Sequence, residues 1–193
     1  WKWDGTRIQA VAGVDESGKP VQRLYSRTGE DISKSFPDLL EALKLPGAID
    51  GELLIVREGR VQSFNVLQQR LNRKTVNAKL IQEFPAHIRA YDLLVDEHED
   101  LRDKPFAERR AKLEAFVARL NDPRIDISPI VPFASWPALT AARADRELLG
   151  HLPDGGGGVG HLVARALLEL PQERVDHRGG IDAGRREAVE QDV

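Results

Sequence analysis

Alternating apolar and polar positions predict several β-strands in the first part of the chain. The run WKWDGTRIQAVAG (1–13) alternates up to the turn DESGKP, and VQRLYS (21–26) follows as its returning strand. AIDGELLIV (48–56) and VQSF (61–64) flank the tight turn REGR and predict a second hairpin. Two further strands are predicted at HIRAYDLLV (87–95) and IDISPIVPF (125–133).

Helical spacing of apolar residues predicts helices between these strands. A short helix is expected at residues 36–44, and Ser63 is a good N-cap for the helix that follows it. TVNAKLIQEF (75–84) predicts another helix, and helical sequence resumes at Trp136. The longest predicted helix begins after Pro105, and its apolar face consists of Phe106, Leu113, Phe116, Val117 and Leu120. Hairpins interspersed with helices predict an α+β fold of antiparallel sheets flanked by helices.

The composition narrows the possible functions. The chain has 193 residues and a net charge of −3, so contact with nucleic acid requires a local basic patch. Cysteine is absent, which excludes disulfides, thiol catalysis and zinc–thiolate sites. No apolar run approaches the length of a membrane span and no signal peptide leads the sequence, so we expect a cytoplasmic protein without membrane contact. We also expect a monomer. Methionine is also absent, which suggests a fragment.

The character of the sequence changes after residue 150. LPDGGGGVG (152–160) is a glycine-rich break, no aromatic residue follows Trp136, and no lysine follows Lys112. The remaining segment is polar and has little apolar area to offset the entropy cost of ordering. We therefore expect a folded domain over residues 1–150 and a divergent, flexible tail over residues 151–193.

Three short stretches place charged residues within predicted strands, where charges are costly unless they have partners. Residues two apart along a strand share a face, so Lys2 and Asp4 point the same way, as do Asp50 and Glu52. One interpretation is exposed strand faces, with the two Asp-Gly pairs at turns. The other is a functional site to which all three stretches contribute. The stretches are Lys2, Asp4, Gly5 and Arg7; Asp50, Gly51 and Glu52; and Arg89, Tyr91 and Asp92.

Together these stretches resemble the motifs of one enzyme family. KWDGTR resembles the lysine motif of ATP-dependent DNA ligases and related covalent nucleotidyltransferases, and SRTGEDISKSFP, AIDGELL and IRAYDLL follow in the family's order. SFNVLQQRLNRKT and LRDKPFAERRAKLE are similar to further stretches of bacterial ATP-dependent DNA ligases. The resemblance covers about residues 1–145 and implies the nucleotidyltransferase (adenylation) fold of these ligases, in truncated form.

The resemblance implies that Lys2 is the catalytic nucleophile. In the family a lysine amine attacks the α-phosphate of ATP, and the resulting AMP passes to the 5′-phosphate of a nick in double-stranded DNA. The neighbouring 3′-hydroxyl then displaces AMP, which seals the nick during repair or recombination. The attacking amine has to be unprotonated, and nearby cations or desolvation lower the pKa of a lysine.

Other matched positions imply contacts with ATP and Mg²⁺. By resemblance Arg7 contacts the nucleotide sugar, and Arg27 contacts the sugar or the nick phosphate. Glu52 would bind the ribose or a divalent metal, and Tyr91 would stack on the adenine ring. Mg²⁺ fits because carboxylate and phosphate oxygens are its usual ligands. Asp4, Asp50 and Asp92 also match motif positions, and for them a structural role is at least as well supported as a functional one.

A basic run follows the second hairpin. RLNRKTVNAK has no acidic residue, which is typical of a solvated helix face but also of a surface that binds DNA phosphates. Its cationic members are Arg70, Arg73, Lys74 and Lys79.

The tail departs from the family pattern. The family's later motifs carry a glutamate and several lysines that bind the α-phosphate, and this chain has no lysine after Lys112. Two interpretations stay open: the adenylation domain of a DNA ligase, or a truncated, non-catalytic remnant that binds nucleotide or DNA weakly. An RNA ligase or capping enzyme is a third, although LQQRLNRKT and AYDLL favour DNA ligase. The tail is also consistent with out-of-frame coding.

Limited proteolysis tests the predicted division of the chain. We expect the first cut between Gly155 and Gly160, because glycine-rich polar sequence gives little protection. Mass spectrometry of the first fragments would locate the cut. Protection there equal to that of residues 106–120 would contradict this division.

Overall fold

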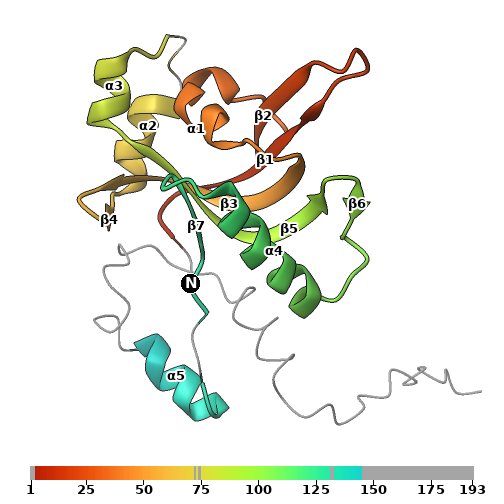
Figure 1. The fold of residues 1–193 in the computed structure, drawn as a ribbon. Coiled ribbons are helices and arrows are strands. Elements are labelled where there is room, and N and C mark those ends of the chain that lie inside the picture. The colour runs from red at the N-terminus through yellow and green to blue at the C-terminus, as the bar shows by residue number, and fades with distance from the viewer. Residues whose placement is uncertain (1–2, 72, 74, 131–132, 145–193) are drawn as a thin grey trace, which may run out of the picture. The chain divides into compact units, whose positions relative to one another are not determined.

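The computed structural model describes residues 3–71, 73, 75–130 and 133–144. The strands are β1 (Thr6–Val14), β2 (Pro20–Ser26), β3 (Gly47–Arg57), β4 (Arg60–Val61), β5 (Ala86–Asp96), β6 (Glu99–Asp100) and β7 (Ile125–Ile127). The helices are α1 (Pro37–Ala42), α2 (Phe64–Leu71), α3 (Ala78–Glu83), α4 (Phe106–Leu120) and α5 (Trp136–Ala144), with a 3-10 turn η1 (Ser33–Ser35). Both predicted hairpins and all predicted helices are present (Figure 1).

The strands form one mixed sheet in which β3 is central. The main order is β2-β1-β3-β5-β6, with β4 paired to β3 and β7 paired to β5. The prediction of antiparallel pairing is confirmed for every pair except β5 and β7, which run parallel. The chain passes through α4 between β5 and β7, and a parallel pair requires such a long crossover. The two-residue strand β6 was not predicted.

The apolar core lies on one face of this sheet. Ile8 and Ala10 of β1 and Ile88 and Ala90 of β5 are almost completely buried, as alternation along a strand requires. Helix α4 packs against β5 and β7, and α1 contacts β2 and β5 (Figure 1). The buried side chains of α4 are Leu113, Phe116 and Leu120, three of the five that the sequence predicts for its apolar face.

Two register shifts interrupt the pairing of β3 with β5. Asp50 pairs with Asp92, whereas the next residue, Gly51, pairs with Ala90, so Tyr91 is an extra residue of β5 at this point. A second shift lies between Ala48 and Ile49 of β3 and makes Leu94 another extra residue of β5. Bulges of this kind bend a strand and redirect side chains. The sequence alone predicted a regular strand here.

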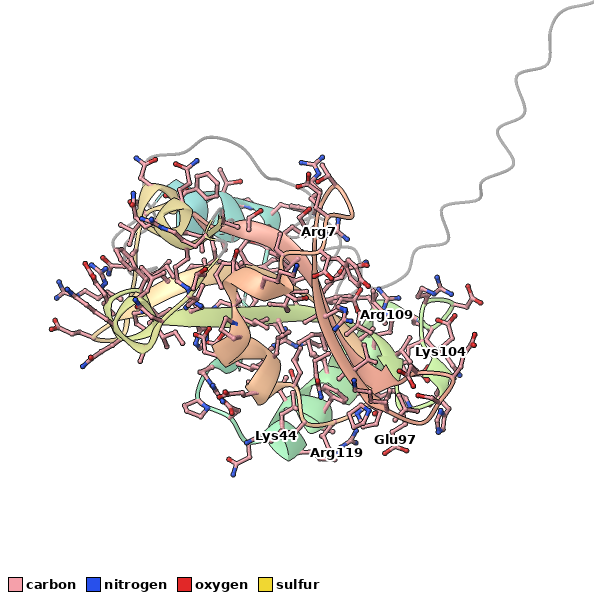
Figure 2. All side chains as sticks on the ribbon, turned by 90° about the horizontal axis from the view of Figure 1, so that it is seen from above. Arg7, Lys44, Glu97, Lys104, Arg109 and Arg119 are labelled. Carbon is pink, nitrogen blue, oxygen red and sulfur yellow. The ribbon has the colours of Figure 1, made fainter. Side chains whose placement is uncertain are left out.

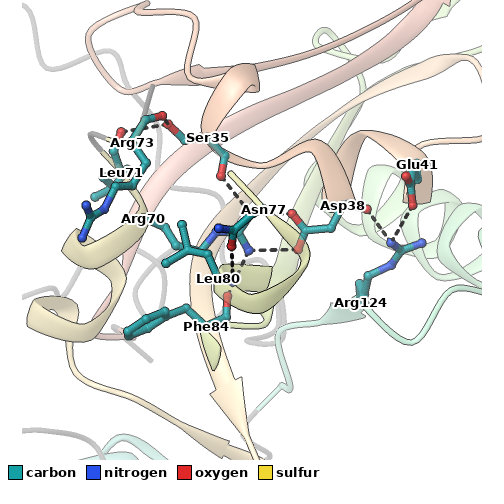
Figure 3. A network of polar contacts seen from close by, with 10 residues as sticks. All are labelled: Ser35, Asp38, Glu41, Arg70, Leu71, Arg73, Asn77, Leu80, Phe84 and Arg124. Carbon is teal, nitrogen blue, oxygen red and sulfur yellow. Dashed lines mark hydrogen bonds and ion pairs between the residues drawn. The ribbon is translucent and has the colours of Figure 1, made fainter. Parts of the chain in front are cut away.

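A buried arginine ties the helices at one end of the sheet together. The Arg70 guanidinium is fully buried and forms two bonds with the Asp38 carboxylate, at 2.5 and 3.0 Å. It also donates to the carbonyl oxygens of Ser35 and Phe84 and lies 4.8 Å from the ring of Phe36. Figure 3 shows how Arg70 thereby joins α2 to α1 and to the end of α3.

The burial of Arg70 corrects one prediction from the sequence. Arg70 was a candidate for binding DNA phosphates, but its two terminal nitrogens donate inside the protein and its side chain has no exposed surface. Arg73 and Lys79 of the same basic run are exposed. Lys74 lies outside the described residues.

The predicted boundary at residue 150 also lies outside the described residues. Within the described part of the chain, no helix has both the length and the apolar character needed to cross a membrane.

Replacing Arg70 tests the importance of the buried ion pair. Arg70→Ala should lower the free energy of unfolding by about 3–5 kcal/mol, because it leaves the Asp38 carboxylate buried without its cation. Urea denaturation would measure the change. Arg102→Ala is the control, since it removes a similarly short ion pair of 2.6 Å, with Asp100, that is exposed. Equal effects of the two substitutions would contradict this account.

Candidate functional site

A row of alternating charges crosses the sheet on the face opposite the core. In the strand register Arg7 of β1 lies opposite Glu52 of β3, Glu52 lies opposite Arg89 of β5, and Arg89 lies opposite Asp126 of β7. Ile8, the neighbour of Arg7, is completely buried, so the row points away from the core. The fold thus gathers charges that are far apart in the sequence.

Arg7 is held by Asp50, two residues before Glu52 on β3. The Arg7 Nη2 atom lies 2.5 Å from Asp50 Oδ2, and this hydrogen bond raises the pKa of Arg7. The Asp50 side chain is 6% exposed and that of Arg7 is 53% exposed. Asp50 therefore anchors a guanidinium whose outer part remains open to a ligand.

Tyr91 lies at the register shift beside these charges. Burial raises the pKa of its hydroxyl above the ordinary value, and the positive charge of Arg7 only partly offsets this, while Asp50 and Glu52 add to the increase. The hydroxyl therefore stays neutral at physiological pH. Tyr91 presents a partly buried aromatic ring close to Arg7 and Glu52.

The residues that follow Lys2 are each anchored to a different element. The Arg89 guanidinium carbon lies 4.0 Å from the centre of the Trp3 ring, and Trp3 Nε1 lies 3.4 Å from Ser128 Oγ. The Asp4 carboxylate accepts a 2.9 Å hydrogen bond from the backbone N–H of Phe64, the first residue of α2. Asp4 thus satisfies a backbone donor that the helix itself leaves unpaired.

Both Asp-Gly pairs lie where the backbone passes close to a neighbour. A Cβ atom on Gly5 would lie 2.3 Å from the carbonyl oxygen of Leu53, and one on Gly51 would lie 2.9 Å from Ile88 Cγ2. Gly51 is in the middle of β3, so the turn interpretation is wrong for Asp50-Gly51. Close approach of the strands, which only glycine permits, explains both positions.

Asp92 completes the set of motif aspartates with structural contacts. Its two carboxylate oxygens accept hydrogen bonds from Arg109 Nε and Nη2 at 2.8 and 2.9 Å, which joins β5 to α4. Asp4, Asp50 and Asp92 therefore each hold a helix or an arginine in place.

Comparison with known proteins places this arrangement in a family. The family described as "ATP dependent DNA ligase domain" matches residues 1–136. The chain belongs to this family. The matched region contains Lys2 and every strand of the charged row, so the family resemblance seen in the sequence is confirmed.

Among relatives of this ligase domain, a probable DNA ligase of Koribacter versatilis is 36% identical over 131 residues, covering 66% of this chain and 22% of the relative. A probable DNA ligase of Sorangium cellulosum is 33% identical over 185 residues, covering 93% of this chain and 31% of the relative. The chain thus spans between about a fifth and a third of the length of these relatives. The second alignment covers so much of the chain that it extends into the segment after residue 150.

Solved structures show the same fold. The ligase domain of M. tuberculosis LigD matches with a TM-score of 0.54 and 24% identity, covering 74% of this chain and 43% of that one. A Lig E DNA ligase, described as binding DNA with a minimal scaffold, matches with a TM-score of 0.52 and 18% identity. The match covers 77% of this chain and 50% of that one. The expected adenylation-domain fold is confirmed.

Three further predicted site residues of the ligase domain are Arg27, Lys2 and Lys74. Arg27 is exposed in the turn after β2, at the end of the β1–β2 ladder nearest Arg7. Lys2 and Lys74 lie outside the described residues. The sequence does not predict a role for Asp126, because a lone aspartate in a short strand has no pattern that indicates a function. Trp3 and Arg89 lie within the recognised motifs, but the sequence does not predict their contact with each other.

The described residues contain no group of three or more histidine, aspartate or glutamate side chains that could hold a metal ion. Mg²⁺ often binds through one or two carboxylates together with water and substrate phosphates.

A pair of glycine substitutions tests the close approach at the lysine motif. Gly5→Ala should lower the free energy of unfolding by about 1–3 kcal/mol, because the new methyl group meets the Leu53 carbonyl. Gly13→Ala is the matched control, since a Cβ atom there meets nothing within 4 Å. Thermal unfolding would compare the two. A Gly5→Ala protein as stable as Gly13→Ala would contradict the packing described here.

Proposed function

We propose that this chain is the adenylation domain of an ATP-dependent DNA ligase and forms a lysyl-AMP intermediate on Lys2. The observation that carries the proposal is the anchoring of Trp3 and Asp4, directly after Lys2, and the close approach of Gly5 to Leu53, beside the face that holds Arg7, Glu52 and Tyr91. A backbone whose next two residues are anchored is suited to positioning a nucleophile.

The formation of lysyl-AMP requires no reactant other than ATP. The neutral Lys2 amine attacks the α-phosphorus of ATP, a nitrogen–phosphorus bond forms, and the bond from the α-phosphorus to the bridging oxygen breaks. Pyrophosphate leaves with the bonding electrons, and the amine loses a proton to solvent. Such transfers depend on positioning and on cations that meet the developing charge.

The charged face offers partners for each part of the nucleotide. Tyr91 supplies an aromatic ring for the adenine, and Arg7, fixed by Asp50, supplies a donor for the ribose. Glu52 lies opposite Arg7 and would bind the ribose or an Mg²⁺ ion. Arg27, exposed near the same end of β1, would contact the sugar or the phosphate of the nick.

The DNA partner is a nicked duplex, with AMP transferred to its 5′-phosphate and sealing completed by the 3′-hydroxyl. Arg73 and Lys79 are exposed and remain candidates for phosphate contacts, together with Lys74. Repair or recombination is the proposed setting, and a cytoplasmic monomer remains our expectation.

Labelling with ATP carrying a radioactive α-phosphate tests the proposal. In the presence of Mg²⁺ the chain should acquire the label, and Lys2→Arg should abolish it, because arginine supplies no usable nucleophile at neutral pH. Lys19→Arg, in the exposed turn between β1 and β2, is the matched control and should label normally.

Label that survives in Lys2→Arg would contradict the assignment of the nucleophile. No label in the unsubstituted chain would instead support the alternative of a non-catalytic remnant, with at most weak binding of nucleotide or DNA.

A further inference from the structure

The residue directly after the proposed nucleophile rests in a site formed by strands far along the chain. Trp3 is separated by more than 80 residues from Arg89 and by 125 residues from Ser128, yet it contacts both. We propose that Arg89, paired with Asp126, is a positioning residue that clamps Trp3 and thereby fixes the backbone that carries Lys2. The inference rests on the proposed role of Lys2.

The ion pair fixes the plane of the Arg89 guanidinium. Arg89 Nε lies 2.9 Å from Asp126 Oδ1 and Arg89 Nη2 lies 2.6 Å from Asp126 Oδ2, so the two groups meet side by side. The Arg89 side chain is only 16% exposed, and His87 Nε2 lies 3.1 Å from the same carboxylate. A bidentate pair of this kind holds a guanidinium in one orientation.

Trp3 is held against this fixed plane. The guanidinium carbon lies 4.0 Å from the centre of the Trp3 ring, within the range of a cation–π contact. Ser128, whose hydroxyl oxygen lies 3.4 Å from Trp3 Nε1, is itself fixed because its N–H donates to the Ala90 carbonyl at 2.7 Å. The arginine and the serine together restrict both the tilt and the rotation of the indole.

A fixed Trp3 restricts Lys2 through the peptide bond between them. The reacting nitrogen and phosphorus have to approach to about 3–3.5 Å along the correct line, and a displacement of about 1 Å costs on the order of a hundredfold in rate. Asp4 holds the segment on the other side of Trp3. Without the clamp, the residues before Asp4 would be free to shift.

A competing explanation is that Arg89 acts through Glu52, which lies opposite it on β3. The two explanations differ in what they change. Loss of the clamp lowers the rate of adenylation at saturating ATP, whereas a disturbed Glu52 weakens ATP binding. Trp3 lies in the clamp but not in the charged row, so a Trp3 variant separates them.

The test compares Arg89→Lys, Trp3→Ala and the double variant in adenylation at saturating ATP. Lysine keeps the charge beside Asp126 but lacks the planar fork. Each single variant should slow adenylation by about tenfold to a hundredfold, with ATP affinity within about threefold of the unsubstituted chain. The double variant should be no slower than the worse single variant, because both remove one interaction. Trp3→Phe, which keeps an aromatic face, should recover part of the rate.

The matched control is Arg119→Ala. Arg119 also pairs with an aspartate of β5, Asp96 at 2.6 Å, and also lies over an aromatic ring, that of Phe116 at 5.4 Å. Figure 2 shows it well away from Arg7. This variant should adenylate at the normal rate.

Rates unchanged in both single variants, or a loss that lies entirely in ATP affinity, would overturn the proposal. Amide hydrogen exchange at residues 2–5 gives a readout that needs no catalysis. Exchange there should be faster in Arg89→Lys and unchanged in Arg119→Ala, and equal protection in Arg89→Lys and the unsubstituted chain would overturn the clamp. This readout distinguishes failure of the clamp from failure of the proposed nucleophile, which would show as an unlabelled chain.

Discussion

The register of β3 against its two neighbours is the constraint on which the site depends. Arg7, Glu52 and Arg89 meet only because β1, β3 and β5 pair with these residues opposite one another. A slip of one residue would turn the charges of a strand toward the core. Gly51 helps to fix this register, because its lack of a side chain lets β3 approach Ile88 closely.

Three arginines show how exposure decides what the same side chain does. All three pair with aspartate, but their side chains are 0%, 16% and 53% exposed at Arg70, Arg89 and Arg7 respectively. Arg70 uses its two terminal nitrogens to join helices. Arg89 is largely enclosed and stacks on Trp3, and of the three only Arg7 has much surface left for a ligand. A basic residue in the sequence therefore does not by itself identify a contact with DNA.

The sequence predicted the local features of this domain more reliably than the long-range ones. The hairpin of β1 and β2 follows from alternation and turn residues, and α4 follows from Pro105 and the spacing of Leu113 and Phe116. The site residues came from resemblance to a family, because one lysine in a K-x-D-G setting carries little information on its own.

Long-range contacts account for what the sequence did not predict. The parallel pairing of β7 depends on where α4 returns the chain, and the extra residue at Tyr91 depends on pairing with β3. The burial of Arg70 depends on Asp38, which is 32 residues away. None of these relations has a periodic signal.

We propose that the face bearing Arg7, Glu52 and Tyr91 binds ATP with its α-phosphate toward Lys2. A crystal structure with a non-hydrolysable ATP analogue tests this most directly. We predict the adenine against Tyr91, the ribose beside Arg7 and Glu52, and the α-phosphate near Lys2. A nucleotide bound elsewhere, or bound on this face with its phosphates directed away from Lys2, would contradict the account.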